Sequence, residues 1–238
     1  MNVRGAVALA GEAAFVVAVY GLYSVIRVIV RGTDVEAFHN GAGIVDIERR
    51  LGIFIEPQVQ TLVTSLPAGD EFVRQVYLWG YLPFIIGAAV LLYARNRGLY
   101  LRYRNGFFVA MAIGLVLFAL LPTAPPRMFP ELGFADLVNG MPQERAWKNE
   151  YAAVPSFHCG FTLLAAVGLA HLYGFRLWPS LAFAVVPALM VLATVATANH
   201  WLLDAVAGWA VVLTAWWVAV GRPAAAAELS PSPLPLSG

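Results

Sequence analysis

Long apolar stretches separated by short polar segments dominate the hydropathy pattern of the chain. A bilayer core is crossed by about 20 helical residues, and several of the stretches approach that length. We expect six membrane-spanning helices, the first of which stays in the protein rather than being removed as a signal peptide. The predicted spans are residues 3–30, 76–94, 106–121, 157–173, 178–198 and 201–220.

Residues 31–74 are mixed in character and predict a different kind of element. Apolar side chains recur there at helical spacing, with charged residues on the other faces. We expect an amphipathic helix that ends near Pro57. It either lies at the membrane interface or packs over the helix bundle, and the pattern leaves both open. The apolar face consists of Ile44, Ile47, Leu51 and Ile55.

The composition agrees with a membrane protein. Hydrophobic residues make up 60% of the chain and charged residues 12%, with a mean hydropathy of +0.72. A soluble domain is nearer half apolar and a quarter charged. The fold class is therefore predicted to be all-α, a polytopic membrane helix bundle that forms one domain over residues 1–222. The tail, residues 223–238, reads as disordered. A net charge of +1 gives no reason to expect a nucleic-acid partner.

The distribution of basic residues predicts the orientation. Four arginines, Arg95, Arg97, Arg102 and Arg104, follow the second span in what we expect to be a short connector. By the positive-inside rule this connector is cytoplasmic, so both termini lie inside and the polar starts of the fourth and sixth spans lie outside. The excess of arginine over lysine favours a bacterial origin and hence the inner membrane.

Two short motifs place titratable side chains at the starts of apolar spans. Ser156 and His158 are expected in the first turn of a helix that begins near Pro155, where free N–H groups and the helix dipole favour a bound anion. His200 and Asp204 are four residues apart and would share one helical face. The carboxylate can then hold one imidazole nitrogen and leave the other free to react. Because an acid inside a span is costly, we favour a phosphate site over a structural role.

A cation is also needed at such a site. Arg127 follows a proline-rich turn after the third span, where it is either an interfacial arginine or a clamp for phosphate oxygens. Arg145 and Lys148, in the same loop, are the other candidates. Two histidines and one aspartate lack a further strong ligand, so we predict no metal site and no cofactor. The remaining candidates, His171 and Cys159, are interpreted as structural.

These motifs resemble those of the type 2 phosphatidic acid phosphatase superfamily. Pro155-Ser-Phe-His158 is similar to its second motif, Pro-Ser-x-His, and His200-Trp-Leu-Leu-Asp204 to the His-x-x-x-Asp end of its third. The surroundings, including Pro122-Thr-Ala-Pro-Pro-Arg127, most resemble the inositol-phosphorylceramide synthase branch. The resemblance covers roughly residues 75–220.

The resemblance implies a role for each residue. His200 would be the nucleophile that forms a phosphohistidine, and Asp204 would orient it. His158 would protonate the leaving alcohol and then activate the acceptor. Ser156 and nearby N–H groups would hold the phosphoryl oxygens. The substrate would be a lipid phosphate or phospholipid in the bilayer, and the oligomeric state stays open.

The chain also departs from the family pattern. Leu120 stands where the first motif has lysine, and Ala193 and Thr194 stand where the third has Ser-Arg. Two family cations are thus missing, which favours singly charged diesters over dianionic monoesters. We expect a phosphodiester head-group transferase. The alternatives are a phosphatase for lipid phosphates or polyprenyl (di)phosphates, and a non-catalytic lipid-binding or transport protein. The joint presence of both histidines and the aspartate favours an enzyme.

Overall fold

The computed structural model describes residues 3–138 and 149–220, and these ranges fold into helices joined by short loops. The predicted all-α fold class is confirmed. The elements are α1 (Val3–Ile29), α2 (Asp34–Leu51), α3 (Glu56–Ser65), α4 (Gly69–Gln75), the π-helical η1 (Val76–Gly80), α5 (Tyr81–Arg95), α6 (Arg97–Leu120), the 3₁₀ turns η2 (Pro126–Met128) and η3 (Pro130–Leu132), α7 (Phe157–Leu172), α8 (Leu177–Ala196) and α9 (Leu202–Val220).

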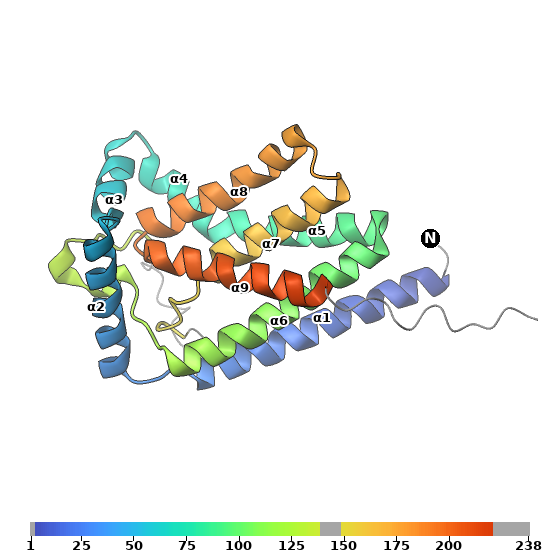
Figure 1. The fold of residues 1–238 in the computed structure, drawn as a ribbon, viewed down its shortest axis with the longest axis horizontal. Helices are drawn as coiled ribbons and strands as arrows, with labels where there is room; N and C mark the ends of the chain where they lie inside the picture. The colour runs from blue at the N-terminus through green and yellow to red at the C-terminus, as the bar shows by residue number, and fades with distance from the viewer. Residues whose placement is uncertain (1–2, 139–148, 221–238) are drawn as a thin grey trace, which may run out of the picture.

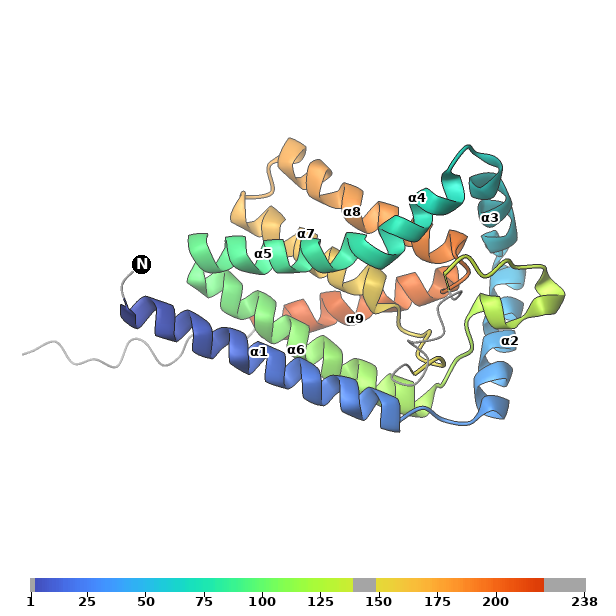
Figure 2. The ribbon, with the colours of Figure 1, turned by 180° about the vertical axis from the view of Figure 1, so that it is seen from behind.

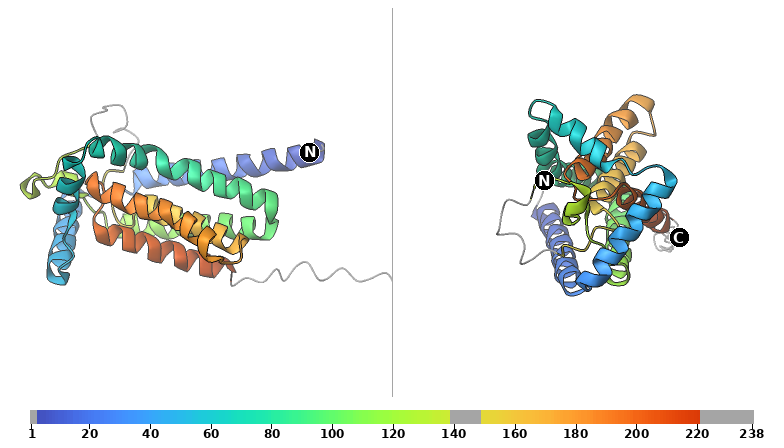
Figure 3. Two further views of the ribbon diagram at one scale, coloured as in Figure 1. Left: turned by 90° about the horizontal axis from the view of Figure 1, so that it is seen from above. Right: turned by 90° about the vertical axis from the view of Figure 1, so that its left-hand side faces the viewer.

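Helices α1, α5, α6, α7, α8 and α9 run along the long axis of the molecule, and α2 and α3 lie across one end (Figure 1). Helix α7 is the centre of the bundle, because most of its residues are buried and it packs against α5, α6, α8 and α9. Helix α1 lies on the outside, along α6, as the reverse view shows (Figure 2). The view onto the α2 end shows this helix crossing the ends of the other helices (Figure 3).

The helices are those of an integral membrane protein. Five described segments are long and apolar enough to cross a membrane: Val7–Ile29, Gly69–Arg95, Arg97–Leu120, Leu177–Ala196 and Leu202–Ala219. The remaining predicted span corresponds to α7, which is apolar but shorter, with 16 residues. Its neighbours enclose it, so it needs less contact with lipid than the outer helices.

The turn between α5 and α6 differs from the predicted connector. Asn96 alone separates the two helices, so Arg97 and Arg104 belong to α6. The Asn96 side chain accepts a hydrogen bond from the N–H of Leu99 at 3.0 Å, and this cap lets the helix begin inside the basic segment. Both arginines pair with Glu12 of α1, at 3.3 and 2.7 Å. The basic segment thereby anchors the outer helix.

The amphipathic helix ends earlier than expected. Gly52 adopts a left-handed φ of 69° and closes α2 after Leu51, because glycine takes this conformation without steric cost. Pro57 instead lies in the first turn of α3. The apolar face with Ile47 and Leu51 is exposed, as on a helix at the membrane interface, and a different face of α2 packs on the bundle. The buried face consists of Ala37, Gly41, Val45 and Glu48.

Candidate active site

Three loops converge at the end of the bundle that α2 and α3 cover. One precedes α7, one follows α6, and one joins α8 to α9. The N–H of Thr123 donates to the carbonyl of Tyr151 at 2.7 Å, and the N–H of Arg127 donates to the carbonyl of Ala198 at 2.9 Å. These backbone bonds bring together segments that are far apart in the sequence and fix the positions of their side chains.

His200 lies in the loop just before α9, not on the helix as predicted, yet it contacts Asp204. Its Nδ1 is 3.2 Å from Oδ2 of Asp204 and 3.0 Å from the carbonyl oxygen of Ala153. The same Oδ2 accepts the N–H of Trp201 at 2.9 Å. Asp204 therefore caps the start of its own helix and orients the imidazole in front of it.

These contacts decide which nitrogen of His200 is available. A carbonyl oxygen only accepts, so Nδ1 must carry the proton that it donates to Ala153. The lone pair is then on Nε2, across the ring, and His200 lines a cavity. Burial lowers the pKa of His200 to about 3, and the positive charge of Arg127 adds to this effect. The imidazole is therefore neutral at physiological pH, as a nitrogen nucleophile requires.

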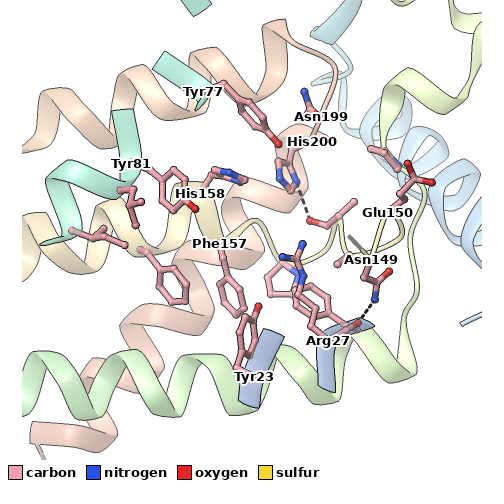
Figure 4. Close-up of a pocket in the computed structure, with 18 of the residues that line it drawn as sticks. Tyr23, Arg27, Tyr77, Tyr81, Asn149, Glu150, Phe157, His158, Asn199 and His200 are labelled. Atoms are coloured by element: carbon pink, nitrogen blue, oxygen red, sulfur yellow. Dashed lines mark hydrogen bonds between the residues drawn. The ribbon is translucent and has the colours of Figure 1, made fainter. Parts of the chain in front are cut away.

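His158 faces the same cavity from the first turn of α7 (Figure 4). Its ring lies 5.8 Å from that of His200, measured between centroids. Two tyrosines pack against it, Tyr77 at 4.6 Å and Tyr81 at 4.7 Å. They come from the π-helical turn and the start of α5, just before Pro83, which lacks the N–H that a regular helix needs there.

A close approach of α7 to α9 holds the two motifs together. A Cβ on Gly208 would lie 2.2 Å from the carbonyl oxygen of Ser156, so only glycine fits there. Gly160 meets the backbone of Gly208 in the same way. The N–H of Ser156 donates to the carbonyl of Asp204 at 2.9 Å. The distance between the two histidines is thus set by backbone contacts.

The cavity between these elements has a volume of about 350 Å³. Its polar wall includes both histidines, Arg127 and Asn199, and its inner part is lined by apolar side chains such as Ile85 and Phe161. Most ligand sites combine an apolar lining with a few placed polar groups. The cavity therefore suits a molecule with an anionic head and an apolar remainder.

The predicted phosphate-binding residues lie in different places. Arg127 lines the cavity, and its Nη1 donates to Oδ1 of Asn199 at 2.8 Å. Ser156 is fully buried, and its hydroxyl oxygen accepts the N–H of Cys159 at 3.5 Å as the cap of α7. Ser156 therefore does not line the cavity. Two further candidates, Arg145 and Lys148, lie outside the described residues.

Several cavity residues were not singled out from the sequence. Arg27 carries a charge inside the first apolar span, which is itself a signal of function. Tyr77 and Tyr81 have no sequence signal beyond their spacing, and Asn199 only its place beside His200. All four line the cavity.

Two buried carboxylates support the site from behind. Glu56 accepts the N–H of Leu202 at 2.9 Å, and Glu48 accepts the N–H of Leu203 at 2.8 Å. Both side chains are fully buried. Burial raises the pKa of Glu48, and a hydrogen bond with Glu56 raises it further.

Comparison with known proteins finds a distant relative. Phosphoinositol dihydroceramide synthase of Bacteroides thetaiotaomicron is 25% identical over 203 residues, which cover 74% of this chain and 65% of that protein. The match thus spans less than two thirds of the relative. No solved structure matches the chain.

The family comparison is more extensive. The profile described as PAP2 superfamily matches residues 42–218, which include both histidine motifs and exclude α1. Together with the synthase relative, this match supports an enzyme that acts on phosphate esters. Since the matched region covers most of the chain and contains the whole constellation of His158, His200 and Asp204, the protein belongs to the PAP2 superfamily.

Proposed function

We propose that this protein transfers a phosphate-linked head group between lipids through a phosphohistidine on His200. The observation that carries the proposal is the orientation of His200, which is neutral and held through Nδ1. Membership of the superfamily supports the phosphate chemistry. The name of the synthase relative supports transfer of a head group onto a second lipid.

In the first step, Nε2 of His200 attacks phosphorus and the bond from phosphorus to the lipid alcohol breaks. His158 donates its proton to the departing oxygen. Asp204 and the carbonyl of Ala153 accept hydrogen bonds from Nδ1 and stabilise the positive charge that develops on the ring. Arg127 binds oxygens of the phosphoryl group.

The second step reverses the roles. His158, now neutral, takes the proton from an acceptor hydroxyl, whose oxygen attacks phosphorus. The bond between phosphorus and Nε2 breaks, and His200 is restored. A lipid alcohol as acceptor gives head-group transfer, whereas water gives hydrolysis.

Substrate charge favours a diester. Neither family cation position is filled: Leu120 is exposed on the outside of α6, and Thr194 is fully buried and has no charge. A monoester carries about −1.5 to −2 near neutral pH, and each extra charge must be offset at a low-dielectric site. A diester carries a single charge. Phosphatase activity on lipid monoesters is the second candidate, favoured by the superfamily itself.

A substrate panel tests the proposal. Purified protein in vesicles is given an inositol phospholipid with a ceramide acceptor, phosphatidic acid, and a polyprenyl diphosphate. We expect head-group transfer from the inositol phospholipid to exceed hydrolysis of phosphatidic acid or of the polyprenyl diphosphate. His200→Ala should abolish this transfer. Efficient hydrolysis of phosphatidic acid without any diester reaction would show that the protein is a phosphatase. Lipid binding without any turnover would favour the transport alternative.

Metal independence stays a prediction. Within residues 3–138 and 149–220, no group of three or more His, Cys, Asp or Glu side chains is placed to hold a metal ion. We expect turnover to survive treatment with a chelator followed by dialysis. Loss of turnover that one divalent ion restores would contradict this prediction.

A further inference from the structure

Arg27 is a charged side chain in the last turn of α1, a helix that is otherwise apolar near this end. It lines the cavity, and Figure 4 shows its side chain reaching from α1 toward His200. The amide of Asn149 donates to the Arg27 carbonyl at 2.9 Å, which ties this part of α1 to the loop before α7. Arg27 is therefore held at the site rather than directed into lipid.

The guanidinium of Arg27 lacks an anionic partner in the described part of the chain. No carboxylate there forms an ion pair with it, although Glu150 lines the same cavity. Its Nε is buried without a hydrogen-bond acceptor, and its Cζ lies 5.6 Å from the centroid of the Phe118 ring. A cation inside a membrane protein is costly unless it is compensated. An anion in the cavity would compensate it.

Arg27 lies at a site that lacks positive charge relative to the family motifs. The chain has leucine at position 120 and threonine at position 194, the two places where the motifs that it resembles would have a cation. Arg27 comes from a helix that the family match leaves out, because the match begins at residue 42. Arg27 can thus supply one of the two missing charges from a segment outside the family motifs, and the site still has one cation fewer than the family pattern.

We propose that Arg27 binds a non-bridging phosphate oxygen of the group held at His200, so that α1 completes the active site. Arg27 and Arg127 then bring two guanidinium groups from separate segments to one phosphate. The assignment of the anion as a lipid phosphate rests on the proposed function, whereas the binding of a phosphate anion does not.

The test uses Arg27→Gln, Arg27→Lys and Arg27→Ala in the full-length protein, with Arg50→Gln as the matched control. Arg50 is an exposed arginine on α2, at the same end of the molecule and outside the cavity. One arm measures binding of inorganic phosphate by ³¹P NMR. The other measures kcat and KM with the lipid substrate that the panel identifies. Adding millimolar guanidinium to Arg27→Ala tests for rescue of the lost group.

We expect Arg27→Gln to weaken phosphate binding and kcat/KM by tenfold to a hundredfold, on the order expected for one lost charge-assisted hydrogen bond. Arg27→Lys should restore part of both, guanidinium should rescue Arg27→Ala, and Arg50→Gln should behave as wild type. Wild-type phosphate binding by a folded Arg27→Gln variant would overturn the proposal, whatever happens to turnover. A different result is a protein that binds phosphate in an Arg27-dependent way and shows no lipid turnover. That result would uphold the role of Arg27 and contradict only the proposed function.

Discussion

His200 is buried, yet one of its nitrogens remains available for chemistry. Its Nδ1 is engaged by the Ala153 carbonyl and the Asp204 carboxylate, so the ring cannot rotate without losing both contacts. Asp204 is fixed in turn by the N–H of Trp201. The proposed nucleophile is thus oriented by two groups that are rigid parts of the fold.

The protonation of His200 predicts how stability depends on pH. Its pKa is lowered from 6.5 to about 3 in the folded protein, so the folded state binds fewer protons than the unfolded state between these values. The stabilisation is complete above pH 6.5 and is lost as the pH falls toward 3, by about 1.4 kcal/mol per pH unit. Apparent Tm values of wild type and His200→Gln should therefore converge between pH 7 and pH 4.5. Parallel decreases would show that His200 is not kept neutral by folding.

The contacts of some site residues could be predicted from the sequence, whereas those of others could not. The contact of His200 with Asp204 was predictable, because a spacing of four brings the side chains together even across a helix start. The cap formed by Ser156 was not, since a hydroxyl in a first turn suits either a cap or a phosphate. Arg27 has the signal of a charge within an apolar span, but only the fold shows that α1 lies beside motifs that are far along the chain.

Among the elements, α2 and α3 have a role that their sequences did not suggest. Each contributes one buried glutamate to the first free N–H groups of α9, through Glu48 and Glu56. A helix start has unsatisfied donors, and the two glutamates accept hydrogen bonds from two of them. The helices that cross the end of the bundle thereby fix the helix that carries Asp204.

Substitution of these glutamates tests that role. Glu56→Gln keeps an oxygen acceptor for the N–H of Leu202, whereas Glu56→Leu removes it and leaves a buried donor unsatisfied, at a cost of about 1–3 kcal/mol. We expect the glutamine variant to keep most of its thermal stability and turnover. The leucine variant should lose both. Equal behaviour of the two variants would mean that the cap does not support the site.

The spans were largely predictable from apolar stretches, but their ends were not. The cap at Asn96 draws the basic segment into α6, and the helix before Val76 begins at Gly69. The packed face of α2 consists of small residues and a glutamate, so a search for an apolar stripe selects the exposed face instead. Tertiary contacts, which sequence periodicity does not contain, decide these features.

In the whole molecule, the candidate site and the basic segment lie at opposite ends. The turn between α5 and α6 lies at the end where α1 begins and α9 ends, and α2 covers the other end (Figure 1). If the arginines face the cytoplasm, the site opens on the extracytoplasmic side of what we propose to be a bacterial inner membrane.

Cysteine labelling tests this orientation. In a Cys159→Ala background, Gly98→Cys marks the turn between α5 and α6, and Glu131→Cys marks the loop after α6. Both positions are exposed. An impermeant thiol reagent added to intact cells should label position 131 and leave position 98 unlabelled until the membrane is opened. The reverse pattern would invert the orientation without changing the grouping of the site residues.

The most direct test of the account is the identity of the phosphorylated residue. Protein quenched during turnover of a substrate labelled at phosphorus should carry an acid-labile phosphate, and peptide mapping should place it on His200. His158→Ala should accumulate this intermediate when the leaving group is already good, because its departure needs no proton, and His200→Ala should remain unlabelled. A label on another residue, or full turnover by His200→Ala, would contradict the mechanism.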